Sequence, residues 1–265
     1  MKEILALIDF TPASEHCLKQ AIYLAQANNY SICLCHVSKS YYGEVPEELK
    51  AEMKPFEAKL KEAGIDYSVQ FGQGDLYSEV APIVEERGTK LVMVATHGKR
   101  GLKQNLFGAN IHKLVKHIPV TTLVLSLDSP LAEKAFQKVL LPIAPHDDIL
   151  VKVEACMEVA GENAQFDIFT VLKSGQAIDE KLKSNLSTIG SFLDEKGLSW
   201  NSVEHETDQF SIGYSNSIID YAASNGYDLV AVMTDVSAAN RHYGNVDKES
   251  LLINDKGLQI LSARA

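Results

Sequence analysis

The chain has little cysteine, proline and glycine, and it has no long apolar run. Four cysteines without a C-x-x-C pair or a His-rich tract offer no disulfide framework, which indicates a reducing compartment. With 16 Gly, 8 Pro and an apolar fraction of 46%, the composition excludes a disordered or collagen-like chain. Nowhere do about 18 apolar residues run together, and the N-terminus lacks the apolar region of a signal peptide. We therefore expect a cytoplasmic protein that has no membrane partner.

Basic residues are scarce as well. The chain holds 25 Lys and Arg against 35 Asp and Glu, a formal net charge of −10. Such a chain repels a polyphosphate backbone and would need a locally basic cleft to bind it. Nucleic acid is therefore not expected as a partner.

The two halves of the chain repeat one another. A length of 265 residues suits two domains of roughly 130 residues each. The matching segments are residues 4–9 and 139–144, 32–37 and 167–172 (offset 135), 88–96 and 226–234 (offset 138), and 122–125 and 258–261 (offset 136). The polar segment 128–137, which contains Pro130, has the composition of a linker. We predict domains at residues 1–131 and 132–265.

Each half alternates short apolar strands with helical segments. This alternation predicts an α/β fold, with a five-stranded, mostly parallel sheet flanked by helices on both faces. In the first half we expect strands at residues 3–9, 31–37, 66–71, 90–95 and 120–126. A sheet of this kind binds ligands at the carboxyl ends of its strands, where the strand order reverses.

A glycine-containing loop follows the fourth predicted strand and leads into a helix that begins near Ile111. Glycines let backbone N–H groups approach an anion, and the first turn of a helix offers unpaired donors. Lys99 adds positive charge there. The loop therefore suits phosphate, although Gly98, Gly101 and Gly108 could equally be turn and packing residues.

These segments together resemble the universal stress protein family. The resemblance rests on Asp9 at the end of the first strand, His36-Val37 at the end of the second, and Ala95-Thr-His-Gly98 followed after nine residues by Gly108-Ala109. Family members that keep the motif Gly-x-x-Gly, nine residues, Gly-Ser/Thr bind ATP. Here Gly98 and Gly108 match the motif, whereas Ala95 and Ala109 replace a glycine and a hydroxyl residue. The resemblance implies an adenine-nucleotide site, for ATP with or without Mg²⁺, made by Asp9, Val37, Val94, Ala95, Gly98, Lys99, Gly108, Ala109 and Asn110.

The resemblance also implies the architecture. The family has Rossmann-like domains of the adenine nucleotide alpha-hydrolase-like kind, which dimerise through their last strands. A tandem chain would form that pairing internally, as a pseudo-dimer, because both closing strands need partners for their edges. Association of two chains into a homodimer is left open.

Asp9 has two interpretations. A carboxylate at a strand end can accept hydrogen bonds from ribose hydroxyls, which suits the implied nucleotide. Alternatively, Asp9 caps the helix whose first turn begins at Pro12.

The second half departs from the motif. Ala144 stands where the first half has Asp9, only Gly244 survives in the loop, and Asp235 would repel a phosphate. We expect this domain to have lost the nucleotide site and to serve as a structural or protein-binding partner; binding of another ligand is the alternative.

No Ser/His/Asp grouping occurs at the strand ends, so we expect a binder with at most slow ATP hydrolysis and not an enzyme. Cys33, Cys35 and His36 are too few for a metal site and are expected to pack in the core. The alternative function is a scaffold without nucleotide that acts through protein contacts. An adenylating ligase is disfavoured because residues 10–14, after the first strand, contain no glycine-rich loop.

Overall fold

The computed structural model describes residues 2–96, 111–128, 135–144, 147–175, 177–207, 214–234 and 251–264. The chain divides into two compact units, Met1–Glu133 and Lys134–Ala265. Within the described ranges, no helix has both the length and the apolar character that crossing a bilayer requires.

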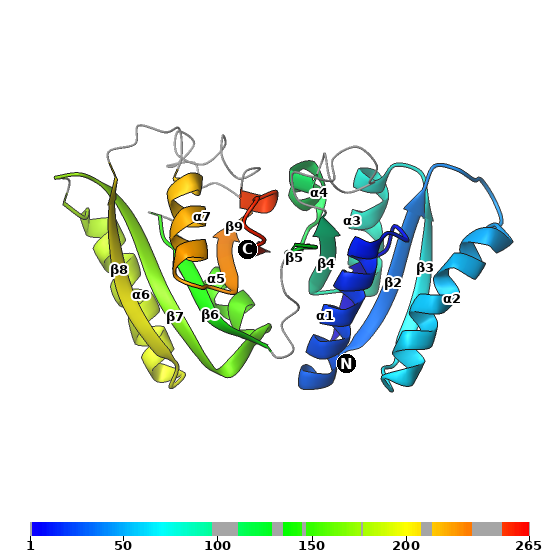
Figure 1. Ribbon diagram of the computed structural model, residues 1–265, viewed down its shortest axis with the longest axis horizontal. Coiled ribbons are helices and arrows are strands. Elements are labelled where there is room, and N and C mark those ends of the chain that lie inside the picture. Colours follow the sequence, from blue (N-terminus) through cyan, green and yellow to red (C-terminus); the bar gives the residue numbers. More distant parts are fainter. Residues whose placement is uncertain are drawn as a thin grey trace. The chain divides into compact units, whose positions relative to one another are not determined.

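Unit 1 contains a five-stranded parallel sheet (Figure 1). In spatial order the strands are β3 (Tyr67–Gln73), β2 (Ser31–Ser38), β1 (Glu3–Leu7), β4 (Leu91–Thr96) and β5 (Thr121–Ser126). Each strand begins within one residue of its predicted start. The three central strands β2, β1 and β4 are almost wholly buried, because helices cover both faces of the sheet. The predicted α/β fold class is confirmed.

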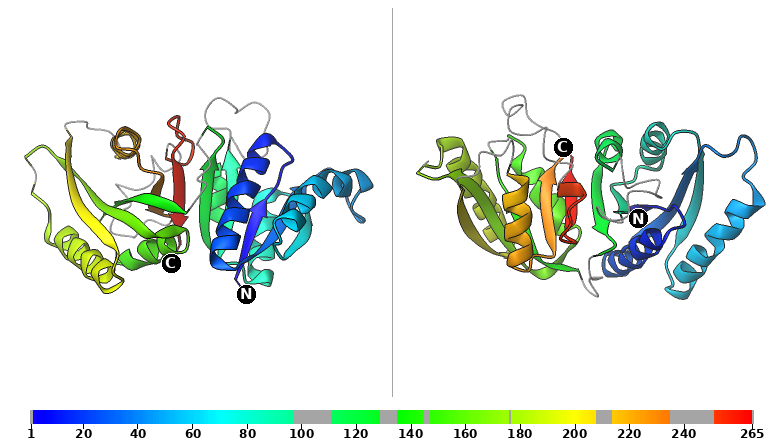
Figure 2. Two further views of the ribbon diagram at one scale, coloured as in Figure 1. Left: turned by 60° about the horizontal axis from the view of Figure 1, so that its bottom comes forward. Right: turned by 45° about the horizontal axis from the view of Figure 1, so that its top comes forward.

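Four helices flank this sheet: α1 (Pro12–Asn28), α2 (Glu47–Glu62), α3 (Leu76–Arg87) and α4 (Ile111–His117). Helix α1 contacts α2, and α3 contacts α4, so the helices pair on the two faces (Figure 2). Helix α1 begins with Pro12, whose fixed φ suits the first turn, and ends at Asn29 in the left-handed conformation. Asp75 caps α3 by accepting a 3.0 Å bond from the backbone N of Tyr77.

Unit 2 has the same strand order as unit 1. Its strands are β8 (Ser199–Thr207), β7 (Ala160–Lys173), β6 (Phe136–Pro142), β9 (Leu229–Met233) and β10 (Gln259–Ala263), all parallel to their neighbours. Its described helices are α5 (Ile149–Met157), α6 (Glu180–Glu195) and α7 (Ser215–Ser224).

The register of the strands corrects two of the predicted alignments. Leu7 pairs with Cys35 in unit 1, and Pro142 pairs with Phe169 in unit 2. Cys35 therefore corresponds to Phe169 at an offset of 134, and the predicted offset of 135 was wrong by one residue for this strand. A register shift between Phe136 and Lys138 accompanies the difference.

The last strands are also displaced from their predicted alignment. Leu91 pairs with Thr121, and Leu229 pairs with Gln259, so β5 and β10 correspond at an offset of 138 and not 136. Both segments are buried on both faces and lack a polar–apolar alternation that would fix their register.

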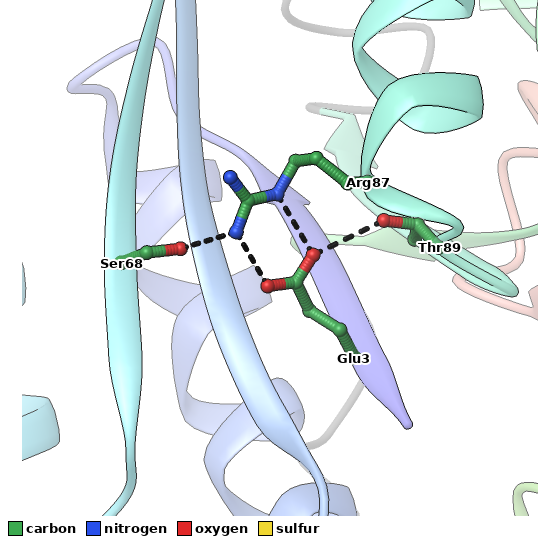
Figure 3. A network of polar contacts seen from close by, with 4 residues as sticks. All are labelled: Glu3, Ser68, Arg87 and Thr89. Carbon is green, nitrogen blue, oxygen red and sulfur yellow. Dashed lines mark hydrogen bonds and ion pairs between the residues drawn. The ribbon is translucent and has the colours of Figure 1, made fainter. Parts of the chain in front are cut away.

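A polar cluster joins the amino-terminal end of the unit 1 sheet (Figure 3). The guanidinium of Arg87 makes a bidentate pair with Glu3, at 2.8 Å from Nε to Oε1 and 2.6 Å from Nη2 to Oε2. Its Nη2 also donates to Ser68 Oγ at 2.5 Å, and Thr89 Oγ1 donates to Glu3 at 3.2 Å. The bond to Glu3 raises the pKa of Arg87. The cluster ties β1, β3 and the end of α3 together without using the carboxyl end of the sheet.

In unit 2, different residues form a polar cluster at the corresponding end of the sheet. The buried carboxylate of Asp167, which corresponds to Cys33, accepts bonds from Gln165 Nε2 (3.0 Å), Asn201 Nδ2 (3.1 Å) and the hydroxyl of Tyr227. Burial and this bond raise the pKa of Tyr227. Both units therefore fix the amino-terminal end of the sheet by polar side chains.

Candidate functional site

The candidate site lies around the carboxyl end of β1, where the chain turns into α1. Asp9 occupies this turn and is half-buried. Its Oδ1 accepts three hydrogen bonds, from Thr11 N (3.2 Å), Thr11 Oγ1 (2.5 Å) and Ser14 Oγ (2.5 Å). Ser14 Oγ in turn accepts a 2.7 Å bond from the backbone N of Asp9. Asp9 thus holds the turn that precedes α1. The N-cap of α1 is Thr11, with no side-chain cap bond, so the capping interpretation of Asp9 was wrong.

The second carboxylate oxygen of Asp9 has a different status. None of the described residues donates a hydrogen bond to Oδ2. An ionised carboxylate has acceptor capacity on both oxygens. Holding the turn does not exclude ligand binding, because Oδ1 holds the turn and Oδ2 can accept a bond from a ligand hydroxyl.

The turn itself has an unusual backbone. Phe10 has a φ of 60° and is left-handed, which is rare for a bulky residue and costs about 1–2 kcal/mol. Its ring lies with its centroid 4.5 Å from that of His36 and 6.1 Å from that of Phe56. Nδ1 of His36 lies 2.8 Å from the carbonyl oxygen of Ile8, so it is the protonated nitrogen and donates. Burial lowers the pKa of His36, which favours the neutral ring.

Val37 follows His36 at the end of β2. The last bond from the β1 segment to β2 runs from Ile8 N to Cys35 O at 2.8 Å. Because successive strand residues direct their backbone groups to alternate sides, those of Val37 point to the same side as those of Cys35. They therefore face the region that β1 leaves when it turns at Asp9.

The side chain of Val37 lies beside Gly72 of β3, the strand that flanks β2 on the side away from β1. Val37 pairs in register with Gly72 of β3, and a Cβ on Gly72 would lie 2.9 Å from Val37 Cγ2. Only glycine at this position leaves the valine its present place.

Strand β4, like β2, extends past the paired part of β1. The paired residues of β1 and β4 end at Ala6 and Met93, while Val94 and Ala95 continue in β4 and pair with β5. Both are buried. The paired part of β1 is therefore shorter than β2 and β4. We call this end of the sheet, where the strand order reverses and where Asp9, Val37, Val94 and Ala95 lie, the notch. The predicted site residues Gly98, Lys99, Gly108, Ala109 and Asn110 lie outside the described residues.

Comparison with known proteins assigns unit 1 to a family. Residues 1–126 match the sequence profile of the Universal stress protein family. The first unit belongs to the universal stress protein family. The chain is also similar to the universal stress protein YxiE of Bacillus subtilis (strain 168), with 23% identity over 133 residues that cover 42% of this chain and 90% of that protein.

The fold of the whole chain is similar to that of a universal stress protein from Archaeoglobus fulgidus DSM 4304. The two structures superpose with a TM-score of 0.68 and 13% identity, over 99% of this chain and 96% of the other. At this identity the similarity establishes the fold, and the chemistry of the site has to be argued from the residues present.

A metal centre was not expected from the cysteines and histidines. In the part of the chain that the structure describes, no group of three or more His, Cys, Asp or Glu side chains could hold a metal ion. All four cysteines are buried free thiols. Burial raises the pKa of Cys33 to about 11, which keeps the thiol neutral.

Unit 2 has different chemistry at the equivalent strand end. Ala144 replaces Asp9, and its carbonyl oxygen accepts a 3.0 Å bond from Asn185 Nδ2. Thr170 corresponds to His36 in the register of β7. Lys152 of α5 is buried and its Nζ donates to the carbonyl oxygen of Pro142. Burial lowers the pKa of Lys152 to about 8.

Two of these features escaped the sequence analysis. The left-handed turn at Phe10 has no signal in the sequence, because the residue is neither Gly nor Asn. Lys152 does have one, since it interrupts the apolar face of a short helix, Ile149–Met157.

Proposed function

We propose that unit 1 binds an adenine nucleotide, ATP, and that the chain works as a nucleotide-dependent universal stress module with a signalling or protective role. The observation that carries the proposal is the notch at the end of β1, where Oδ2 of Asp9 accepts no hydrogen bond from a described residue and Val37 offers strand backbone. A ribose needs an acceptor for its hydroxyls, and an adenine edge pairs with backbone N–H and C=O groups.

The family motif in the sequence of unit 1 supports phosphate binding. Gly98 and Gly108 keep two of its glycines, while Ala109 lacks a hydroxyl. A lost hydrogen bond weakens binding by about 1 kcal/mol, so we expect affinity reduced and not abolished. The proposed protein is a binder, and any ATP hydrolysis should be slow because Asp9 is committed to the turn by Oδ1.

Asp9→Asn gives a specific test by calorimetric titration of ATP and Mg²⁺ into the full chain. Asparagine keeps an oxygen for Thr11 and Ser14, and it replaces the free oxygen by an NH₂ donor. The lost charge-assisted bond should weaken ATP affinity about 10-fold to 100-fold. Asp75→Asn is the matched control, because it removes the same charge from another helix start in unit 1.

Equal weakening by both variants would show a general charge effect and contradict the site. Gly72→Ala should also weaken binding, since it displaces Val37, and a bulky residue at Gly108 should abolish binding without unfolding the chain. If the wild-type chain binds no ATP at millimolar concentration, the alternative stands. That alternative is a scaffold acting through protein contacts, and the buried methyl of Ala95 at the notch favours it.

For unit 2 we propose a structural or protein-binding role. Its strand end has no carboxylate at the position of Asp9, and the carbonyl oxygen of Ala144 already accepts a hydrogen bond from Asn185 Nδ2. A titration should therefore give one ATP site per chain.

A further inference from the structure

The residue on each side of Asp9 contacts one side chain of the neighbouring strand. Ile8 precedes Asp9, and its carbonyl oxygen accepts the 2.8 Å bond from His36 Nδ1. Phe10 follows Asp9, and its ring lies 4.5 Å from the ring of His36, tilted by 33°. The imidazole thus holds both ends of the segment that carries the carboxylate.

His36 is itself fixed by its surroundings. Its ring is 4% exposed and has an edge contact with Phe71 of β3, at 6.3 Å between centroids. Phe56 of α2 closes the other side of Phe10 at 6.1 Å. A buried ring with a satisfied Nδ1 has one orientation available, so it can transmit the rigidity of the sheet to the turn.

The turn needs such a support because its central residue is left-handed. A phenylalanine does not adopt a φ of 60° without external contacts, whereas glycine does. If Phe10 relaxed to the right-handed region, the peptide to Thr11 would reorient, and with it the amide that bonds Asp9 Oδ1.

We propose that His36 is a positioning residue for the nucleotide site, which holds the left-handed turn at Phe10 and thereby orients Oδ2 of Asp9 toward the notch. This role rests on the proposed function. His36 touches the turn and not the nucleotide, so its effect on binding passes through Phe10 and Ile8.

The test is a double-mutant cycle on ATP affinity with His36→Leu, Phe10→Gly and the double variant. His36→Leu should weaken ATP binding about tenfold or more, because the turn loses its support. In the Phe10→Gly background the same substitution should cost less than about threefold, because glycine takes the left-handed conformation unaided. His36→Asn, whose Nδ2 can replace the Nδ1–H donor to Ile8, should retain most of the affinity.

Thr170→Val is the matched control. Thr170 occupies the equivalent position of unit 2 and is buried, and its Oγ1 has no hydrogen-bond partner among the described residues. The substitution should leave ATP affinity unchanged. Circular dichroism on each variant separates loss of the site from loss of the fold, and His36→Phe provides the same cycle if His36→Leu does not fold.

Two results would overturn the role. One is a loss of ATP affinity from His36→Leu that is equally large in the wild-type chain and in the Phe10→Gly background, and the other is unchanged ATP affinity in His36→Leu. Absence of ATP binding in the wild-type chain is a separate result, read before any variant is made. It would overturn the proposed function and this role with it.

Discussion

The buried amine of Lys152 allows a quantitative prediction for unit 2. Its side chain is 2% exposed, and its described contacts are the carbonyl of Pro142 and the neighbouring thiol of Cys156. No carboxylate among the described residues forms an ion pair with it. Burial raises the pKa of Cys156 to about 12, so the thiol carries no charge that could compensate the ammonium at neutral pH. We predict that Lys152→Met stabilises unit 2.

The magnitude follows from the shift in the pKa of Lys152, from the ordinary 10.5 to about 8. Each pKa unit corresponds to about 1.4 kcal/mol, so the charged form costs about 3 kcal/mol in the folded state. The bond to Pro142 offsets about 1 kcal/mol of any gain from removing the amine. Lys152→Met should therefore raise the free energy of unfolding by about 2 kcal/mol at pH 7.

The pH dependence has a definite sign. Below pH 8 the lysine is protonated in both the folded and the unfolded chain, and the full penalty is present. Between pH 8 and 10.5 the unfolded chain binds more protons than the folded chain, so stability rises with pH. The advantage of Lys152→Met over the wild type should therefore shrink across this range.

Urea unfolding followed by tryptophan fluorescence reports the stability of unit 2, because the single tryptophan, Trp200, lies in β8 of that unit. Lys181→Met is the control, since Lys181 is 47% exposed and makes a surface ion pair that contributes little. A difference between Lys152→Met and the wild type that stays constant from pH 7 to 10, or a less stable variant at pH 7, would refute the reasoning.

Two further substitutions test the packing of each unit. Gly190→Ala should lower the melting temperature of unit 2, because the new Cβ would lie 2.6 Å from Trp200 Cζ2. Overpacking of this kind costs about 1–3 kcal/mol, more than the helix preference of alanine returns. A higher melting temperature by circular dichroism would contradict this. Arg87→Lys keeps the charge but loses the bidentate bond to the partly buried Glu3, and should lower the stability of unit 1 by about 1–2 kcal/mol, measured by amide exchange in β1. Unchanged exchange would show that the charge alone holds the strand.

The sequence predicted the strands well because buried parallel strands are short, continuous apolar runs between polar helices. It failed on register for the same reason. Residues 122–125 and 258–261 are mostly apolar, so a shift of two residues leaves the pattern nearly unchanged. Only backbone pairing, such as Leu229 with Gln259, distinguishes the alternatives.

The strand-end residues of the candidate site could be named from the sequence, whereas the backbone conformation of the turn between them could not. Asp9 and Val37 were named because they match positions of the family that the sequence resembles, and the structure places both at strand ends on one edge of the sheet. The left-handed conformation of Phe10 could not be predicted, since it depends on contacts with His36 and Phe56 that come from other elements. Which carboxylate oxygen of Asp9 bonds Thr11 and Ser14 depends in turn on that conformation.

The two units show which part of the fold tolerates change. At the amino-terminal end of the sheet, Glu3 and Arg87 of unit 1 give way in unit 2 to a network centred on Asp167, so a polar network is rebuilt with other residues. At the carboxyl end, Ala144 supplies no carboxylate in place of Asp9, and no imidazole occupies the position of Thr170. A sheet loses stability if buried polar groups at its end are left unsatisfied, so a network there has to be rebuilt when its residues change. This pattern is the one expected if unit 2 keeps the fold without a nucleotide site, as we propose: the polar network that holds the strands is kept, and the carboxylate and imidazole at the carboxyl end are not.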